Sequence, residues 1–224
     1  MELNDRSLPV LSPEEVRILG CLVEKELITP DNYPLTLNAL LAACNQKSSR
    51  YPVVEYNAST VEQGLQSLKE RGFVRSVSGA EHRVPKFKHD VPFMLRLNPA
   101  QTAVLTVLML RGPQTVGEIR GRSDRMYSFD SLDEVASALA DLKDLSGRKL
   151  VMELERLPGT KEPRFAHLLC GNEGIATVTA AETGRSSGAG RGEELAALRD
   201  EVQKLRDEVA SLRVELIEFR NQFD

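Results

Sequence analysis

The sequence predicts a mainly α-helical fold with small β-hairpins (α+β), because three strings of residues occur twice in the same order. The strings are a Leu-x-Pro opening, a Val-x-x-x-Leu-x-x-Leu-Lys stretch and a basic stretch ending in Phe-x-His, which begin at 11, 61 and 83 and again at 97, 135 and 161. Each half therefore reads as three helices followed by a basic hairpin. This is the order of parts in a winged-helix DNA-binding module, so we expect two tandem winged-helix domains followed by a C-terminal coiled-coil helix.

The first helix has a capping-box start, with Ser12 before Pro13 and Glu15 three residues on. The other expected elements of this half are a helix at 36–44, a helix from a Ser59 cap to Gly72, and hairpin strands at 73–77 and 83–88. The second half is expected to repeat the plan with helices at 99–110, 115–122 and 132–145 and strands at 150–156 and 164–169.

The expected domain boundaries follow changes in composition. After the second hairpin, glycine, alanine, serine and threonine replace the helical periodicity, which is typical of a flexible linker. The four expected regions are a first winged-helix domain at 1–92, a second winged-helix domain at 93–170, the linker at 171–192 and a parallel dimeric coiled coil at 193–224.

The last segment carries a heptad pattern with apolar a and d positions, Glu at g and Arg at e. In a parallel pair each Glu meets an Arg of the partner, whereas an antiparallel pair places like charges together. The alternative is an amphipathic helix packed on its own domain. The expected dimerisation residues are Leu195, Leu198, Val202, Leu205, Val209, Leu212, Leu216 and Phe219.

Charge and cysteine content restrict the class of protein. The formal net charge is −4, so any contact with DNA has to come from local clusters of basic residues. Cys21, Cys44 and Cys170 form no CxxC pair, which argues against a zinc site and fits a reducing cytoplasm. The sequence shows no signal or membrane-spanning segment. We expect a cytoplasmic protein without a membrane partner.

No pattern of residues predicts an enzyme. His89 and His167 occupy matched positions in the repeat, which favours packing or a hydrogen bond over a role as catalytic base. Glycine-rich phosphate loops, zinc-binding helix motifs and nucleophile elbows are absent from the sequence. We expect no catalytic residue, no metal and no cofactor.

Double-stranded DNA is the expected partner of the first half. Val61, Leu65 and Leu68 form the core face of its third helix, and the opposite face offers neutral groups able to meet base edges or phosphates. Basic residues surround this face, while Glu62 and Glu70 oppose phosphate binding. The expected nucleic-acid-binding residues are Lys47, Arg50, Thr60, Gln63, Gln66, Ser67, Lys69, Arg71, Arg83, Lys86 and Lys88.

The matching helix of the second half has an acidic outer face made by Asp133, Glu134, Asp141 and Asp144. Carboxylates repel phosphates, so we expect this half to stay out of a DNA groove and regard it as a candidate surface for a protein partner. The leading hypothesis is a dimeric DNA-binding protein that regulates transcription, with the first domain as reader. The alternative is a non-catalytic protein–protein interaction scaffold built on winged-helix domains.

Two blocks of the sequence resemble a bacterial family. Leu-Thr-Leu-Asn-Ala-Leu at 35–40 and Ala-Cys-Asn-Gln-Lys-Ser at 43–48 are similar to the signature of the YceH family, and Leu-Met-Leu-Arg-Gly-Pro-Gln-Thr at 108–115 is similar to its second block. The resemblance covers about 10–171 and implies tandem winged-helix domains in a soluble bacterial protein, without an established activity. Tyr51 departs from the acidic residue that the family favours there, so no role for a carboxylate carries over to this position.

Overall fold

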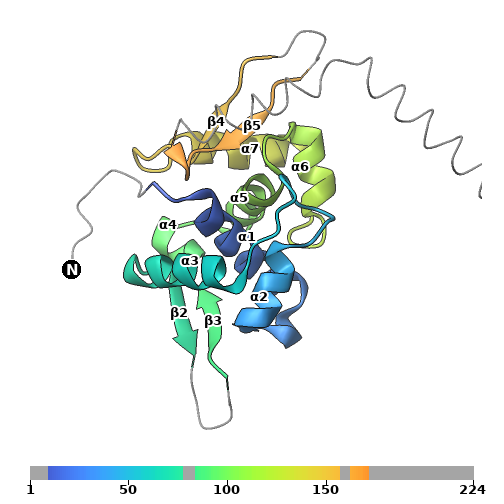
Figure 1. Ribbon diagram of the computed structural model, residues 1–224. Helices are drawn as coiled ribbons and strands as arrows, with labels where there is room; N and C mark the ends of the chain where they lie inside the picture. Colours follow the sequence, from blue (N-terminus) through green and yellow to red (C-terminus); the bar gives the residue numbers. More distant parts are fainter. Residues whose placement is uncertain (1–9, 78–83, 157–161, 172–224) are drawn as a thin grey trace, which may run out of the picture. The chain divides into compact units, whose positions relative to one another are not determined.

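The computed structural model describes residues 10–77, 84–156 and 162–171, which all fall within one compact unit. In chain order the elements are α1 (Pro13–Ile28), η1 (Pro30–Asn32), β1 (Leu35–Thr36), α2 (Leu37–Cys44), α3 (Ala58–Glu70), β2 (Val74–Val77), β3 (Lys86–His89), α4 (Val91–Leu95), α5 (Pro99–Arg111), α6 (Val116–Ser123), α7 (Leu132–Lys143), β4 (Val151–Glu153) and β5 (Phe165–His167). Figure 1 shows helices gathered around α1 and α5, with the β2–β3 hairpin projecting away from them. The predicted α+β class with small antiparallel hairpins is confirmed.

Side-chain caps set where the first helix of each half begins. The hydroxyl of Ser12 accepts the backbone N–H of Glu15 at 3.2 Å, and the Glu15 carboxylate accepts the N–H of Ser12 at 2.7 Å. At α5, Asn98 and Gln101 make the same reciprocal pair at 2.8 and 3.0 Å. These four bonds satisfy backbone donors that the helix itself leaves unpaired, and the capping box predicted for α1 is confirmed.

The two hairpins sit in equivalent surroundings. In the first half the strands form an antiparallel sheet in the order β1-β3-β2, with Leu35 opposite Phe87. In the second half β4 pairs with β5, and Gln114 forms an antiparallel bridge with Phe165. Gln114 therefore takes the place of Leu35, and each of them precedes the threonine that caps the next helix.

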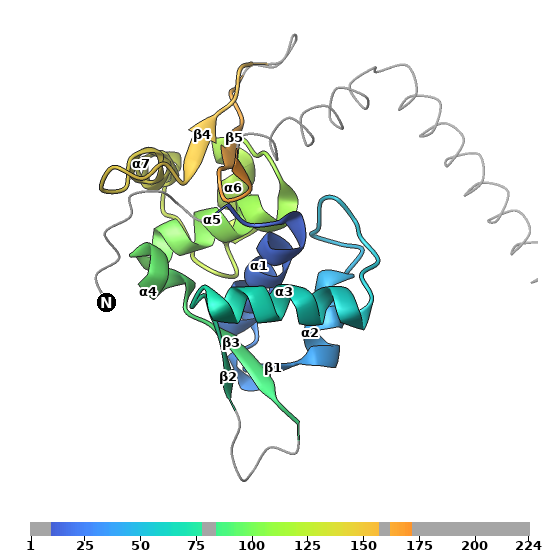
Figure 2. The ribbon, with the colours of Figure 1, turned by 60° about the vertical axis from the view of Figure 1, so that its left-hand side comes forward.

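Helix α1 is buried on all sides because both halves pack against it. Its residues from Glu15 to Glu24 are buried, and it contacts α2, α3 and α5. Figure 2 shows α1 between α5 and α3. A Cβ added to Gly20 would lie 2.8 Å from Cδ2 of Leu110 and 3.3 Å from Cβ of Met109. Gly20 therefore sets the separation of α1 and α5, across which the two halves share one apolar core.

Several local features differ from the sequence expectation or lie beyond it. Helix α3 is capped by Asn57, which accepts the backbone N–H of Thr60 at 2.9 Å, and not by Ser59. The short helix α4 spans the expected boundary between the two domains. The expected linker from 172 onward and the coiled coil at 193–224 lie outside the described residues. Among the described helices, none is both long and apolar enough to cross a bilayer.

Replacing Gly20 by valine is expected to lower the free energy of unfolding by about 1–3 kcal/mol, because the added carbons have to displace the buried Leu110 side chain. Urea unfolding followed by circular dichroism measures the change. Gly117→Ala is the matched control, since this glycine in α6 has no atom within 4 Å of an added Cβ and alanine favours a helix. A Gly20→Val protein as stable as the wild type would contradict the close crossing.

Candidate nucleic-acid interface

The outer face of α3 carries the neutral polar side chains that the sequence predicts to meet DNA. Gln63 and Gln66 are exposed, whereas Thr60 and Ser67 are half-buried. The side-chain amide of Gln66 donates to the carboxylate of Glu70 at 2.8 Å. This face therefore offers donors and acceptors for base edges, together with a carboxylate that opposes phosphates.

The hairpin places two lysines on its outer side. Lys86 and Lys88 alternate with buried residues of β3, Phe87 among them, as the two-residue period of a strand requires. Arg75 lies opposite Lys88 across the ladder and forms a bidentate ion pair with Asp90. The two lysines are therefore the cations that β3 presents for phosphate contact. Predicted Arg83 lies outside the described residues.

Lys69 joins the α3 face to the hairpin. Its ammonium nitrogen lies 4.9 Å from the centroid of the Phe87 ring, within the range of cation–π attraction. The lysine is half-buried, so ring and charge together form the corner between the helix and the strands. Lys69 thus connects α3 to the Phe87 side of β3, while Lys86 and Lys88 alternate with Phe87 and lie on the other side of that strand.

Part of the α3 face borders a groove. The groove has a volume of about 610 Å³, lies between α3 and the start of α1, and is lined from α3 by Thr60, Gln63, Gly64 and Ser67. Arg71 stands at its edge, donating to the carbonyl of Val10 at 2.8 Å and lying 3.8 Å from the Glu15 carboxylate. Arg71 is thus partly neutralised and tied to the residues before α1, although it is exposed as predicted.

Arg50 lies in the interior. Its side chain has no exposed surface, and its guanidinium donates to the two carboxylate oxygens of Glu24 at 3.0 and 2.6 Å. It also donates to the carbonyl of Ala43 at 3.1 Å and to the side chain of Gln46 at 2.8 Å. This placement corrects the expectation that Arg50 contacts DNA, because a buried and fully bonded guanidinium does not reach a phosphate. Lys47, on the same connector between α2 and α3, is exposed.

The connector between α2 and α3 is held by a buried polar network that the sequence analysis missed. Arg17 of α1 donates to the carbonyl of Pro52 at 2.5 Å. Asn45 exchanges two hydrogen bonds with the backbone of Tyr56, each at 2.8 Å. The backbone N–H of Tyr51 donates to a carbonyl of α5 at 2.8 Å. The connector is therefore fixed to both halves of the unit, with Lys47 on its outer side.

The equivalent corner of the second half is neutralised. Lys143 lies 5.0 Å from the centroid of the Phe165 ring and forms an ion pair with Glu153. Glu153 is opposite Phe165 in its hairpin, as Ser76 is opposite Phe87 in the first half. A serine therefore stands in the first half where the second half has a carboxylate, so the two matched lysines differ in net local charge.

The outer face of α7 is acidic, as the sequence predicts. Asp133, Asp141 and Asp144 are exposed. Glu134 is half-buried and accepts a hydrogen bond from the hydroxyl of Tyr127 at 2.8 Å. The exposed carboxylates of α7 and of Asp144 at its C-cap oppose the approach of a phosphate backbone.

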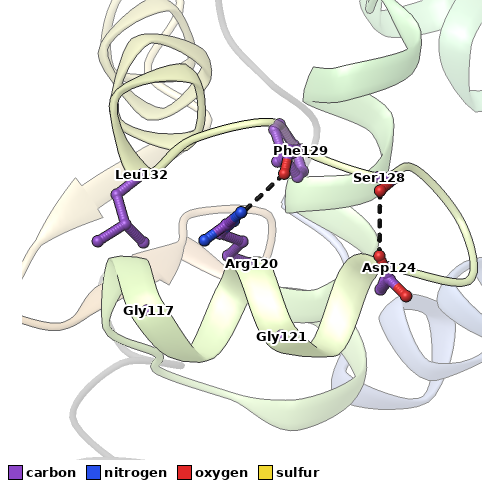
Figure 3. A pocket seen from close by; sticks show the side chains of 7 residues that line it. All are labelled: Gly117, Arg120, Gly121, Asp124, Ser128, Phe129 and Leu132. Carbon is purple, nitrogen blue, oxygen red and sulfur yellow. Dashed lines mark hydrogen bonds between the residues drawn. The ribbon is translucent and has the colours of Figure 1, made fainter.

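A pocket of about 560 Å³ lies beside α6 (Figure 3) and is lined by Gly117, Arg120, Gly121, Asp124, Ser128, Phe129 and Leu132. Its polar side chains are already bonded to each other or to the backbone. Arg120 donates to the carbonyl of Phe129 at 3.2 Å, and Ser128 donates to Asp124 at 3.1 Å. Because Arg120 and Ser128 already make these hydrogen bonds, neither side chain indicates a ligand site in the pocket.

Both matched histidines are neutral near pH 7, and His89 is buried whereas His167 is half-buried. Burial lowers the pKa of His89 and that of His167 to about 4. Nδ1 of His89 accepts the backbone N–H of Val91 at 3.2 Å, so its proton lies on Nε2, which is 2.8 Å from a carboxylate oxygen of Glu26. Within the described part of the chain, no three His, Cys, Asp or Glu side chains gather where they could hold a metal.

Residues 11–160 match the model of a family described as "Protein of unknown function, DUF480". The chain belongs to this family. The family membership expected from the strings at 35–48 and 108–115 is therefore confirmed, and the match spans both halves of the described unit.

Relatives in several bacteria are similar over most of their length. A UPF0502 protein of Geobacter metallireducens is 50% identical over 218 residues, which cover 96% of this chain and 99% of the relative. The UPF0502 protein of Geobacter sulfurreducens is 46% identical over the same shares of the two chains. In Opitutus terrae, a UPF0502 protein is 49% identical over 175 residues, 78% of this chain and 76% of the relative.

Arg50→Met is expected to lower the free energy of unfolding by about 3–5 kcal/mol, because it leaves the Glu24 carboxylate buried without its partner. Lys47→Met is the matched control on the same connector and is expected to change stability by less than about 0.5 kcal/mol, since Lys47 is exposed. Chemical denaturation of both variants gives the two values. Equal small losses would show that the ion pair does not hold the connector.

Proposed function

We propose that the protein is a dimeric DNA-binding protein, a transcriptional regulator, in which each half of the described unit is a winged-helix module and the first one reads duplex DNA. The order of three helices and a hairpin in each half supports this proposal, as does the β1-β3-β2 sheet of the first half. In such a module the third helix meets the base edges while basic side chains of the hairpin meet the phosphates. These parts correspond to α3 and to the β2–β3 hairpin.

The charge at the helix–hairpin corner carries the assignment of the first half as reader. Lys69 and Lys143 make the same contact with an aromatic ring, but Lys143 is paired with Glu153 and Lys69 faces Ser76 at that strand position. Phosphate binding depends on cations that can exchange their counterions for phosphate oxygens. The first corner therefore favours a DNA backbone, and the second one does not.

The exposed residues of the two matched helices also support the assignment of the first half as reader. The exposed residues of α3 include Gln63 and Gln66, whose amides can pair with base edges. The exposed residues of α7 include Asp133 and Asp141, which would be desolvated and repelled in a groove. A single reader for each chain follows from this difference.

Fluorescence anisotropy of a labelled DNA duplex at several salt concentrations tests the proposal. Binding is expected to weaken steeply with salt, because each neutralised phosphate releases counterions. Lys86→Glu/Lys88→Glu is expected to weaken binding at least about tenfold and to reduce the slope of log K against log salt by about 2. Ser76→Glu should weaken binding by about three- to tenfold through an ion pair with Lys69, worth up to about 1 kcal/mol or slightly more.

Matched variants separate charge from shape in this experiment. In Ser76→Gln the new side chain is nearly the same size as in Ser76→Glu but carries no charge, so this variant is expected to bind DNA as the wild type does. Glu153→Gln changes the second corner and is expected to leave affinity unchanged. Full-length protein without salt-sensitive binding would refute the reader and favour a protein–protein scaffold, for which the acidic face of α7 and the exposed Phe93 of α4 are candidate contacts.

The dimer is proposed from the heptads at 193–224, where Glu at g and Arg at e favour a parallel pair. Light scattering of the full chain is expected to give the mass of two copies. Deleting 193–224 is expected to give a single copy, because the proposed coil is the contact between chains. A single copy for the full chain at the concentrations used for DNA binding would contradict the coiled coil without affecting the proposed reader.

A further inference from the structure

Two cysteines lie on facing helices in the core of the first half. Cys21 of α1 and Cys44 at the end of α2 have no exposed surface, and the two thiols lie close enough for each to shift the pKa of the other. Helices α1 and α2 are in direct contact. The pair is therefore a dithiol within one chain and not two isolated packing residues.

The surroundings of this dithiol are fixed by charged side chains of α1 and the connector. Arg17, Cys21 and Glu24 follow one another at helical spacing, so they lie along one face of α1. Arg17 donates to the carbonyl of Cys44 at 3.2 Å. Arg50, which is paired with Glu24, donates to the carbonyl of Ala43 in α2 at 3.1 Å. These bonds keep the end of α2 over Cys21.

The buried charges around the sulfur atoms do not balance. Arg17 and Arg50 supply two cations, and Glu24 supplies the carboxylate that pairs with Arg50. Arg17 donates its hydrogen bonds to the backbone carbonyls of Cys44 and Pro52. A buried cation without a carboxylate favours negative charge nearby, and the nearest group that can carry it on the same face of α1 is the Cys21 thiol.

We propose that Cys21 and Cys44 form an oxidisable dithiol, which a peroxide converts reversibly into an intramolecular disulfide. The Cys21 thiol loses its proton and the thiolate attacks one oxygen of hydrogen peroxide; the O–O bond breaks, a sulfenic acid forms, and the hydroxide that leaves takes up that proton as water. The Cys44 sulfur then attacks the sulfenic sulfur, the S–S bond forms and a second water leaves. Two thiols are thus oxidised by two electrons and the peroxide is reduced by two. A thiol reductant reverses the reaction.

Cys21 is assigned as the first sulfur to react because it lies on the same face of α1 as the buried Arg17. Burial raises the pKa of Cys21, whereas the neighbouring Cys44 and Arg50 lower it. The neighbouring Cys21 and burial raise the pKa of Cys44. Once Cys21 is a neutral sulfenic acid, the two guanidiniums act on Cys44 instead, which assists its attack.

Cys170 provides an internal comparison. It is half-buried in the second half, and burial together with Glu14 and Glu15 raises the pKa of its thiol to about 11. It therefore has more exposed surface than Cys21, but its charged neighbours are carboxylates and not guanidiniums. Cys21 and Cys44 are fully buried, so a peroxide reaches them only through a local opening of the unit. Proximity then directs the sulfenic acid to Cys44 and not to a second chain.

The reduced full-length protein is treated with hydrogen peroxide, alkylated under denaturing conditions, and mapped by mass spectrometry without reduction. The Cys21–Cys44 disulfide is expected to exceed any disulfide containing Cys170 by on the order of tenfold or more, because the partners are held together. Cys170→Ala should leave this yield unchanged. Oxidation of Cys170 while Cys21 and Cys44 are both recovered as alkylated thiols would overturn the proposal, as would an even distribution of disulfides among the three.

A trapping experiment identifies the first sulfur to react. In Cys44→Ala the sulfenic acid has no partner, so a sulfenic-specific 1,3-dione is expected to label Cys21 after peroxide treatment. In Cys21→Ala, Cys44 is expected to remain an unlabelled thiol. Labelling of Cys44 but not of Cys21 would overturn the assigned roles. Neither experiment measures DNA binding, so its result tests the dithiol independently of the proposed function.

Discussion

A guanidinium buried at the end of α2 organises the unit. Arg50 binds both oxygens of Glu24 and three further acceptors, one at the end of α2 and two in the connector, and so turns an irregular connector into a fixed part of the core. The same connector is bonded to α5 through Tyr51 and through Arg111, which donates to Ser49 at 2.6 Å. Removing a buried charge's partner is costly, so the position of the connector and of the start of α3 depends on this ion pair.

Much of the fold is predictable because its signals are local. The Ser12 and Glu15 cap, the Gly72 stop and the alternation around Phe87 act within a few residues of the elements they define, and the structure reproduces them. An arginine in a polar connector is usually solvated, so the sequence predicts a surface position for Arg50. The available signal was on another element, since Arg17 and Glu24 interrupt the otherwise apolar, fully buried run of α1.

The sequence alone does not predict that Lys143 has a carboxylate partner and Lys69 faces a serine, and the reason is geometric. Ser76 and Glu153 stand at different distances along the chain from Lys69 and Lys143, so aligning the repeated strings does not match them. They become equivalent once each is paired with its phenylalanine across the hairpin. Register therefore determines which charges of the repeat meet, and a change of one residue in a turn would have hidden or created the ion pair.

The close crossing at Gly20 has an evolutionary consequence. Two similar halves that meet through equivalent helices, α1 and α5, cover apolar surface on each other within one polypeptide. Once joined, the copies are always present in equal number, and each one is retained for the apolar surface it covers on the other. Selection on ligand contacts can then relax in one copy without its loss. The acidic surface of α7 is the divergence that such a fused pair permits.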